Sequence, residues 1–195
     1  MTSRPRSSTI LIGVGVIVAS ILIVAGAYIA YLTFSPVIHL ATIDETDNST
    51  TQVLAKSQPK TATLFIPKID VTVPYDQEED ALLKGAWWRQ PSNGNPKDGG
   101  NFVLSAHRFI MSYTPSEVQK KSPFYNIDKL KIGDEIYVDY QNKRYTYTIS
   151  ELKSVTPDAV SIENRTENPQ LTLYSCTFGG SLDGRDVIIA KPTDE

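Results

Sequence analysis

Hydrophobic residues in this chain form one long uninterrupted run and many short ones. The long run extends from Ile10 to Phe34 and contains no charged residue. A helix of about 25 residues, rising about 1.5 Å per residue, is about 37 Å long and spans a hydrocarbon core of about 30 Å with some tilt. The pattern therefore predicts a transmembrane helix over residues 10–34.

Charged residues are distributed unequally around this run. Arg4 and Arg6 precede it, whereas acidic residues follow it at positions 44, 45 and 47. The basic residues predict a cytoplasmic N-terminus over residues 1–9 and an extracellular location for the remainder of the chain. A cleavable signal peptide is the rival interpretation, because small residues such as Ala25 and Ala27 resemble a processing site. The apolar region of a signal peptide is normally about 7 to 15 residues long, so the longer run favours an uncleaved signal anchor.

The pattern changes twice after the apolar run. Residues 35–62 are rich in Thr, Ser, Asp and Gln and have neither helical nor strand periodicity. This predicts a flexible stalk that holds the folded part away from the membrane. In residues 63–195, short runs of Val, Ile, Leu and Tyr alternate with Gly, Pro, Asn and Asp. About 130 residues are enough for one domain.

This domain is predicted to be mainly β. Many short strands separated by turn residues are typical of a barrel or sandwich. Gln141, Asn142 and Lys143 lie between two Tyr-rich runs and predict a hairpin turn, while a loop over residues 156–170 is a candidate substrate wall. Weak helical signals cover residues 78–84 and 115–121. The predicted strands cover residues 63–66, 70–73, 101–106, 135–140, 144–155, 171–175 and 186–190.

Composition excludes several classes of protein. The formal net charge is −3 at pH 7, so no basic footprint for nucleic acid is present. One cysteine rules out an intrachain disulfide, and with two histidines no zinc-ligand spacing can be drawn. The acidic run at residues 78–80 is interpreted as a solvated face. We therefore expect no metal and no cofactor.

Three residues are candidates for acyl-transfer chemistry. Cys176 is the single cysteine and ends a predicted strand, His107 is the only histidine in residues 63–195, and Arg185 follows nine residues after the cysteine. A thiol attacks as the thiolate, which needs a positive charge or a base nearby. A guanidinium stabilises the oxyanion that forms on an attacked carbonyl. Each residue also has an ordinary structural explanation: a buried core thiol, a hydrogen-bonded histidine and a solvated turn arginine.

The sequence around these residues resembles the sortases, the membrane-anchored cysteine transpeptidases of bacterial surfaces. Residues 172–176 read Thr-Leu-Tyr-Ser-Cys, similar to the Thr-Leu-x-Thr-Cys strand end of that family. The resemblance covers residues 63–191, and the short spacing from Cys176 to Arg185 is most similar to classes D and E. Two positions depart from the family pattern: Ser175 replaces threonine and Ala106 replaces glycine. Further similar stretches lie at residues 85–88, 96–101, 107–108, 123–125 and 130–134.

The resemblance implies a closed or nearly closed β-barrel with short helices. It implies that Cys176 attacks the Thr-Gly bond of a Leu-Pro-x-Thr-Gly-like sorting motif and that an amine then resolves the thioacyl enzyme. His107 would protonate the leaving amine and deprotonate the incoming one, and Arg185 would hold the oxyanion. The partners would be surface proteins with a C-terminal sorting motif and an amine from a peptidoglycan precursor or a pilin lysine. Candidate substrate-binding residues are Ser175, Thr177, Ala106 and Trp87.

Two other interpretations remain open at this stage. An L,D-transpeptidase also uses Cys, His and Arg, but usually with a glycine beside the cysteine and a second histidine nearby, and this chain has neither. A membrane-tethered β domain that binds a peptide without chemistry would have Cys176 buried.

Overall fold

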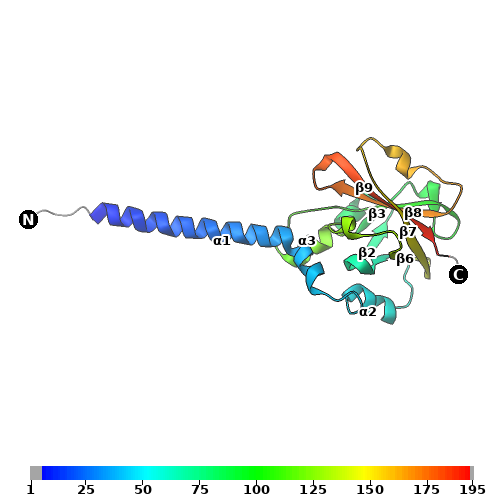
Figure 1. The fold of residues 1–195 in the computed structure, drawn as a ribbon, viewed down its shortest axis with the longest axis horizontal. Helices are drawn as coiled ribbons and strands as arrows, with labels where there is room; N and C mark the ends of the chain where they lie inside the picture. The colour runs from blue at the N-terminus through cyan, green and yellow to red at the C-terminus, as the bar shows by residue number, and fades with distance from the viewer. Residues whose placement is uncertain (1–5, 194–195) are drawn as a thin grey trace, which may run out of the picture.

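A long helix projects from one end of a β-barrel (Figure 1). A computed structural model describes residues 6–193, so Arg4 and most of the predicted cytoplasmic end lie outside the described residues. The helix, α1, extends from Arg6 to Thr42. Its part from Leu11 to Thr42 has a mean hydropathy of 2.5 and is long and apolar enough to cross a membrane. The predicted apolar helix near the N-terminus is therefore confirmed.

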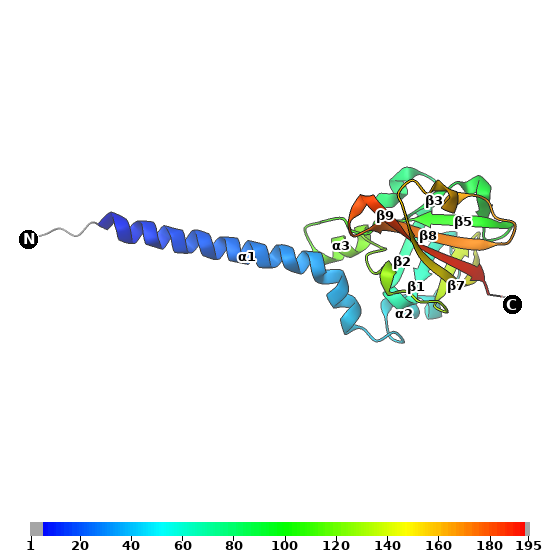
Figure 2. The same cartoon turned by 45° about the horizontal axis from the view of Figure 1, so that its top comes forward.

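The helix α1 bends where it reaches the barrel (Figure 2). Pro36 lies inside α1 and has no N–H to donate, which explains a bend at this position. The Ser35 hydroxyl donates to the Leu32 carbonyl at 2.9 Å and so satisfies the acceptor that the proline leaves free. The Pro36 carbonyl accepts a hydrogen bond from the Asn126 side chain at 3.1 Å, which ties the bend to the barrel.

The structure differs from the prediction of a flexible stalk over residues 35–62. Helix α1 continues to Thr42, and a second helix, α2, covers Ser49–Lys56. The Asn48 side chain caps α2 by accepting from the Thr51 amide at 2.7 Å. Thr50 is fully buried and its amide donates to Asp70. An eight-residue helix is too short to show periodicity, and its polar residues Ser49 and Thr50 bond to Asp70 and Thr72 next to and within β2.

Eight strands close into a barrel in the order β3-β2-β1-β6-β7-β9-β8-β5, with β3 also paired to β5. The closed barrel agrees with the fold class that the sequence predicts. Pairs β2–β3 and β5–β8 are parallel, and the other neighbours are antiparallel. The strands are β1 Ala62–Ile66, β2 Val71–Asp76, β3 Ala86–Arg89, β5 Gly99–Ser105, β6 Glu135–Tyr140, β7 Lys143–Val155, β8 Gln170–Thr177 and β9 Gly180–Pro192, with β4 Gly94–Asn95 beside β5.

Side chains that point into the barrel form one core. Along β2 the burial alternates at every residue, as expected when one face of a strand is inside. Trp88 lies in this core, with its ring edge-on to Tyr75 and to Phe102 at centroid distances of 6.2 and 5.2 Å. The fully buried large side chains include Phe65, Phe102, Phe124, Leu64, Leu104, Ile136, Leu171 and Leu173.

The predicted strands correspond to seven of the nine observed ones, and the sequence did not predict β4 or β3. Its pairing with β2 requires Gly85, because a Cβ there would lie 2.1 Å from the Pro74 carbonyl oxygen. The predicted hairpin turn is present, with Asn142 at φ 63°. The remaining helices are α3 Pro115–Lys121 and the 3-10 turns η1 Pro67–Ile69, η2 Glu79–Leu83, η3 Pro91–Asn93, η4 Ile127–Lys129 and η5 Val160–Glu163.

Candidate active site

The ends of β5 and β8 bring His107 and Cys176 to the same edge of the barrel. These strands are parallel, and their last registered pair is Ser105 with Tyr174. The Ala106 amide extends the ladder by donating to the Tyr174 carbonyl at 3.3 Å. Two residues beyond the last pair, the same register leads to His107 on one chain segment and Cys176 on the other. Neighbouring strands lie about 4.8 Å apart, so the two backbones are adjacent.

On its other side, Cys176 pairs with Arg185 of the antiparallel strand β9. The register shifts immediately after this pair, because Thr177 is opposite Gly180. The intervening residues 181–184 therefore bulge out beside the thiol. Arg185 Nη1 donates to the carbonyl oxygens of Ser181 and Gly184, at 2.9 Å in each case. The bulge thus holds the guanidinium in a defined position.

The three residues share the outward face of the barrel. Leu104, Leu173 and Ile188 point into the core on the three adjacent strands. His107, Cys176 and Arg185 each lie an odd number of residues away from these core positions, so their side chains point the opposite way. Cys176 is half-buried, between the core and the solvent. In the described part of the chain, no hydrogen bond joins its thiol to His107 or Arg185.

A buried arginine with two partly exposed carboxylate partners lies on the inward face beneath this row. Arg108 is 4% exposed and donates to Asp186 at 2.8 Å and to Asp128 at 2.7 Å. Asp186 pairs with Ser175 in the β8–β9 ladder. The Arg108–Asp186 bond therefore joins the segment after His107 to β9, across the end of β8. It fixes the two strands that flank Cys176.

Burial of the His107 side chain determines the protonation state of this candidate base. Loss of hydration lowers the pKa of His107 below its ordinary value of about 6.5. The imidazole is therefore mostly neutral at neutral pH and free to accept a proton. The His107 carbonyl accepts from the Phe124 amide at 3.2 Å, which holds the histidine backbone in place.

The loop between β7 and β8 is attached to the outward face by Glu163. Its carboxylate accepts from Arg89 Nε at 2.9 Å and from the Tyr174 hydroxyl at 2.5 Å. The Asn93 side chain donates to the Glu163 carbonyl at 2.8 Å. Tyr174 lies on the same face of β8 as Cys176, two residues away. The predicted substrate wall is therefore anchored close to the thiol.

The predicted substrate-binding residues occupy different surroundings. Trp87 is half-buried, its indole N–H donates to the Gln77 carbonyl at 3.0 Å, and the Arg89 guanidinium stacks over its ring at 3.9 Å. Thr177 is also half-buried and donates to Asp183. Ser175 and Ala106 lie on the inward face instead. Ala106 is 5% exposed and Ser175 is 2% exposed.

Ser175 has an unusual environment for a polar side chain. Among the described residues, its buried hydroxyl oxygen has no hydrogen-bond partner. Its role as a substrate-binding residue stays a prediction, as do the roles of the other site residues.

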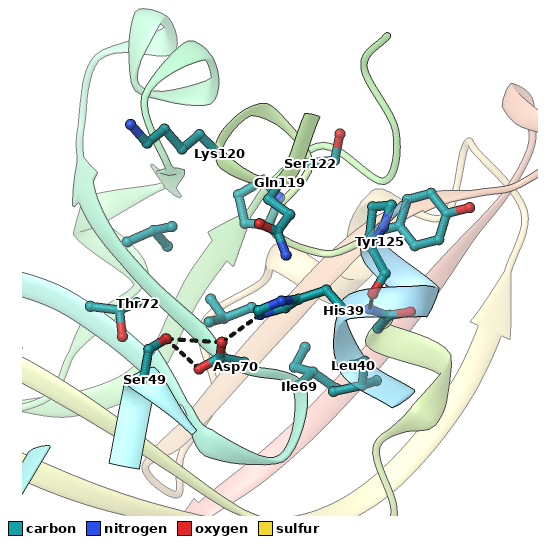
Figure 3. Close-up of a pocket in the computed structure, with 15 residues that line it drawn as sticks. His39, Leu40, Ser49, Ile69, Asp70, Thr72, Gln119, Lys120, Ser122 and Tyr125 are labelled. Carbon is teal, nitrogen blue, oxygen red and sulfur yellow. Dashed lines mark hydrogen bonds and ion pairs between the residues drawn. The ribbon is translucent and has the colours of Figure 1, made fainter. Parts of the chain in front are cut away.

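A pocket elsewhere on the molecule lies between α1, α2 and β2 (Figure 3). Asp70 is at its base and accepts from His39 Nε2 at 2.9 Å and from the Ser49 hydroxyl at 2.7 Å. None of His107, Cys176 and Arg185 lines this pocket.

Sequence reasoning assigned no role to Arg108 or Glu163, although the pair His107-Arg108 was part of the family resemblance. Arg108 could have been noticed because it directly follows His107, but nothing in the sequence indicated that the Arg108 side chain is buried. Glu163 lies 74 residues from Arg89 and within a loop, so its partners could not be identified from the pattern.

Comparison with known proteins identifies one family. A family model described as a sortase domain matches residues 64–193. Sortase A of Streptococcus agalactiae serotype III is 30% identical over 135 residues, which cover 65% of this chain and 50% of that protein. The solved structure of sortase E1 from Streptomyces coelicolor, with a tripeptide in its active site, has a TM-score of 0.54 and 27% identity, covering 70% of this chain and 89% of that chain.

A sortase D5 transpeptidase of Clostridium perfringens has the same fold, with a TM-score of 0.56 at 21% identity over 86% of this chain and 99% of that chain. Similarity to sortase E1 is consistent with the class E part of the resemblance. The chain spans about half the length of the curated relatives it matches, between 40% and 50%.

Proposed function

Because this chain belongs to the sortase family, we propose that it is a membrane-anchored cysteine transpeptidase. It cleaves a Leu-Pro-x-Thr-Gly-like sorting motif and transfers the acyl group to an amine of the cell wall or of a pilin. The observation that carries this proposal is the position of Cys176, on one outward face between His107 and Arg185, at the ends of three adjacent strands.

The reaction begins with a proton transfer from the Cys176 thiol to the neutral imidazole of His107. The sulfur then attacks the carbonyl carbon of the motif's threonine, and the resulting oxyanion accepts hydrogen bonds from the Arg185 guanidinium. The bond from this carbon to the glycine nitrogen breaks, and His107 returns its proton to the leaving amine. A thioester to Cys176 remains.

An amine resolves the thioester in the second half of the reaction. His107 removes a proton from the amine as its nitrogen attacks the acyl carbon, and the thiolate of Cys176 leaves. Attack by water at the same step would give hydrolysis instead.

The anchor and its orientation belong to the same proposal. Residues 10–34 span the membrane, residues 1–9 are cytoplasmic, and the barrel of residues 63–195 is the extracellular catalytic domain. Support comes from the length and hydropathy of α1 and from the basic residues before it.

Mass spectrometry of the full-length chain in detergent micelles tests the function. The chain is incubated with a library of sorting-motif peptides, with and without an amine such as triglycine. We expect cleavage between Thr and Gly, an acyl adduct on Cys176 and a new peptide joined to the amine. Hydroxylamine should release the adduct because it is a thioester.

Two variants complete this test. Cys176→Ala should abolish cleavage and adduct formation together. Ser116→Ala changes an exposed hydroxyl in α3 and serves as the matched control. If the wild-type chain binds the peptides but forms neither adduct nor product, it is a binding domain and the proposed enzyme function fails.

A further inference from the structure

The barrel is fixed directly against the apolar helix. The Tyr28 hydroxyl donates to the Tyr113 carbonyl at 2.7 Å, and the Tyr125 hydroxyl donates to the Thr33 carbonyl at 2.9 Å. Tyr28 and Thr33 both lie within the apolar run of α1. Segments that are 85 and 92 residues apart in sequence therefore meet inside or beside the membrane-spanning part of the helix.

The segment that meets Tyr28 is residues 109–114, which we call the 109–114 loop. It begins two residues after His107 and leads into α3. Met111 and Tyr113 in this loop are 47% and 86% exposed, and Tyr28 of α1 is 49% exposed. Large apolar and aromatic side chains thus form an exposed patch that continues from the loop onto the helix.

Polar groups of the loop are bonded on its inner side. The Ser112 hydroxyl is buried and donates to Glu117 at 2.9 Å. The Ile110 amide donates to the Ser122 hydroxyl at 2.8 Å, and the Thr114 hydroxyl caps α3. These bonds hold the loop in one shape, with the Ser112 side chain turned inward. Such an arrangement suits a region of low dielectric constant, where unpaired polar groups are unfavourable.

The depth of this patch follows from the geometry of the helix. Counted from Ile10, about 20 residues cross a hydrocarbon core of about 30 Å, which places its outer boundary near residue 30 and residues 31–34 of the span in the interfacial layer. Tyr28 and Tyr31 then lie at that boundary, where tyrosine is enriched in membrane proteins. Because Tyr28 bonds to the backbone of Tyr113, the 109–114 loop lies at the same depth.

We propose that the 109–114 loop lies in the interfacial layer of the outer leaflet, with Met111 and Tyr113 against lipid. The inference rests on the proposed membrane anchoring. The partner that covers this exposed patch is the phospholipid bilayer itself, because the patch is continuous with the membrane-spanning face of α1. His107, two residues before this loop in the sequence, therefore lies close to the bilayer surface rather than at the end of a stalk.

Spin-label accessibility in liposomes tests this placement. Cys176→Ala removes the only cysteine, after which single cysteines are introduced at Met111, Tyr113 or Glu167 and labelled with a nitroxide. Tyr113→Cys leaves the bond from Tyr28 in place, because that bond uses the backbone carbonyl. Glu167 is exposed and belongs to the loop before β8. Figure 2 shows this loop at the end of the barrel away from α1. The full-length chain is reconstituted into vesicles of phosphatidylcholine and phosphatidylglycerol.

Oxygen concentrates in lipid and a nickel chelate stays in water, so their relative collision rates report depth. For labels at 111 and 113 we expect an oxygen-to-nickel ratio about tenfold above that at 167, because apolar side chains in the interface are shielded from water. Ratios at 111 and 113 equal to that at 167 would overturn the inference. Circular dichroism of each labelled chain verifies that the barrel is folded.

A fourth label separates this inference from the anchoring on which it rests. Val18 lies in the middle of α1 and is 49% exposed. If the Val18→Cys label is in lipid while the 111 and 113 labels are in water, the anchor stands and the placement of the loop is wrong. If the Val18→Cys label is also in water, both the anchoring and the inference are wrong.

Discussion

Cys176 is directly opposite Arg185 in the antiparallel pair of β8 and β9. The guanidinium bonds to two carbonyls of its own bulge through Nη1 only, and its other N–H groups can donate to an anion. A thiol and a fixed planar donor are therefore held on neighbouring strands, as an acyl-transfer site requires.

Arg185→Lys tests whether this donor acts in the transition state. Lysine keeps the charge but lacks the planar fork, so we expect kcat to fall about 10²- to 10³-fold with little change in KM. Steady-state cleavage of a sorting-motif peptide measures both constants. Arg165→Lys is the control, because Arg165 is exposed and bonds only through Nη1 to the Asn93 carbonyl in the described structure. Equal losses in kcat and in peptide binding would indicate a binding role for Arg185.

His107 makes stability depend on pH. Burial lowers its pKa in the folded state, so the unfolded chain binds a proton more readily. Stability is therefore intact above the unfolded pKa of about 6.5 and is lost as pH falls from there through the lower folded value. The Tm of the wild type should fall more steeply between pH 7 and pH 5 than that of His107→Gln. Parallel Tm curves for the two chains would contradict this expectation.

The ion pair beneath the site should be important for stability. Arg108→Met leaves Asp186 without its buried partner, and we expect unfolding free energy in urea to fall by about 3 kcal/mol. Asp128→Asn should have a smaller effect, of about 1 kcal/mol or less, because Asp128 is 40% exposed. The double variant Arg108→Met with Asp186→Leu should recover much of the loss, since the only carboxylate then left without Arg108 is Asp128, which is 40% exposed and also pairs with Lys129 at 3.1 Å. Equal effects of the two single variants would show that Asp186 is not the main partner.

Glu163 should control the mobility of the loop between β7 and β8. Burial raises the pKa of its carboxyl, but the hydrogen bonds from Arg89 and Tyr174 outweigh this and hold the pKa below its ordinary value. The ionised Glu163 carboxylate therefore stabilises the folded state fully above its unfolded pKa of about 4.3. This contribution is lost as the pH falls through the lower pKa of Glu163 in the folded state. Glu163→Gln should lower stability by about 1 to 3 kcal/mol and speed amide exchange over residues 156–170. Glu167→Gln, at an exposed position nearby, should leave exchange unchanged.

Ser175→Ala distinguishes a packing role from substrate binding. Its buried hydroxyl has no partner among the described residues, so its removal should leave Tm unchanged or raise it slightly. An unchanged KM for the sorting-motif peptide would fit a residue on the inward face. A raised KM with unchanged Tm would support the sequence-based prediction that Ser175 contacts substrate.

Local patterns in the sequence were sufficient to predict much of this protein. The apolar run predicted α1, alternation and turn residues predicted seven strands, and Pro115–Lys121 is helical as its signal indicated. These features depend on residues that are close together in the sequence, so their spacing alone is enough to predict them. The candidates His107, Cys176 and Arg185 could also be named, because few residues of those types were available.

Tertiary structure decided how these parts meet. Only the fold places His107 and Arg185 on either side of Cys176, buries Arg108 against Asp186, and replaces the expected stalk with a barrel fixed to α1. The bonds involved join residues that are far apart along the chain, such as the 92 positions between Thr33 and Tyr125. The periodicity of hydrophobic residues in the sequence indicates only which face of a helix or strand is apolar. Which polar atoms become partners depends on strand register and chain path, because these set the distances in space.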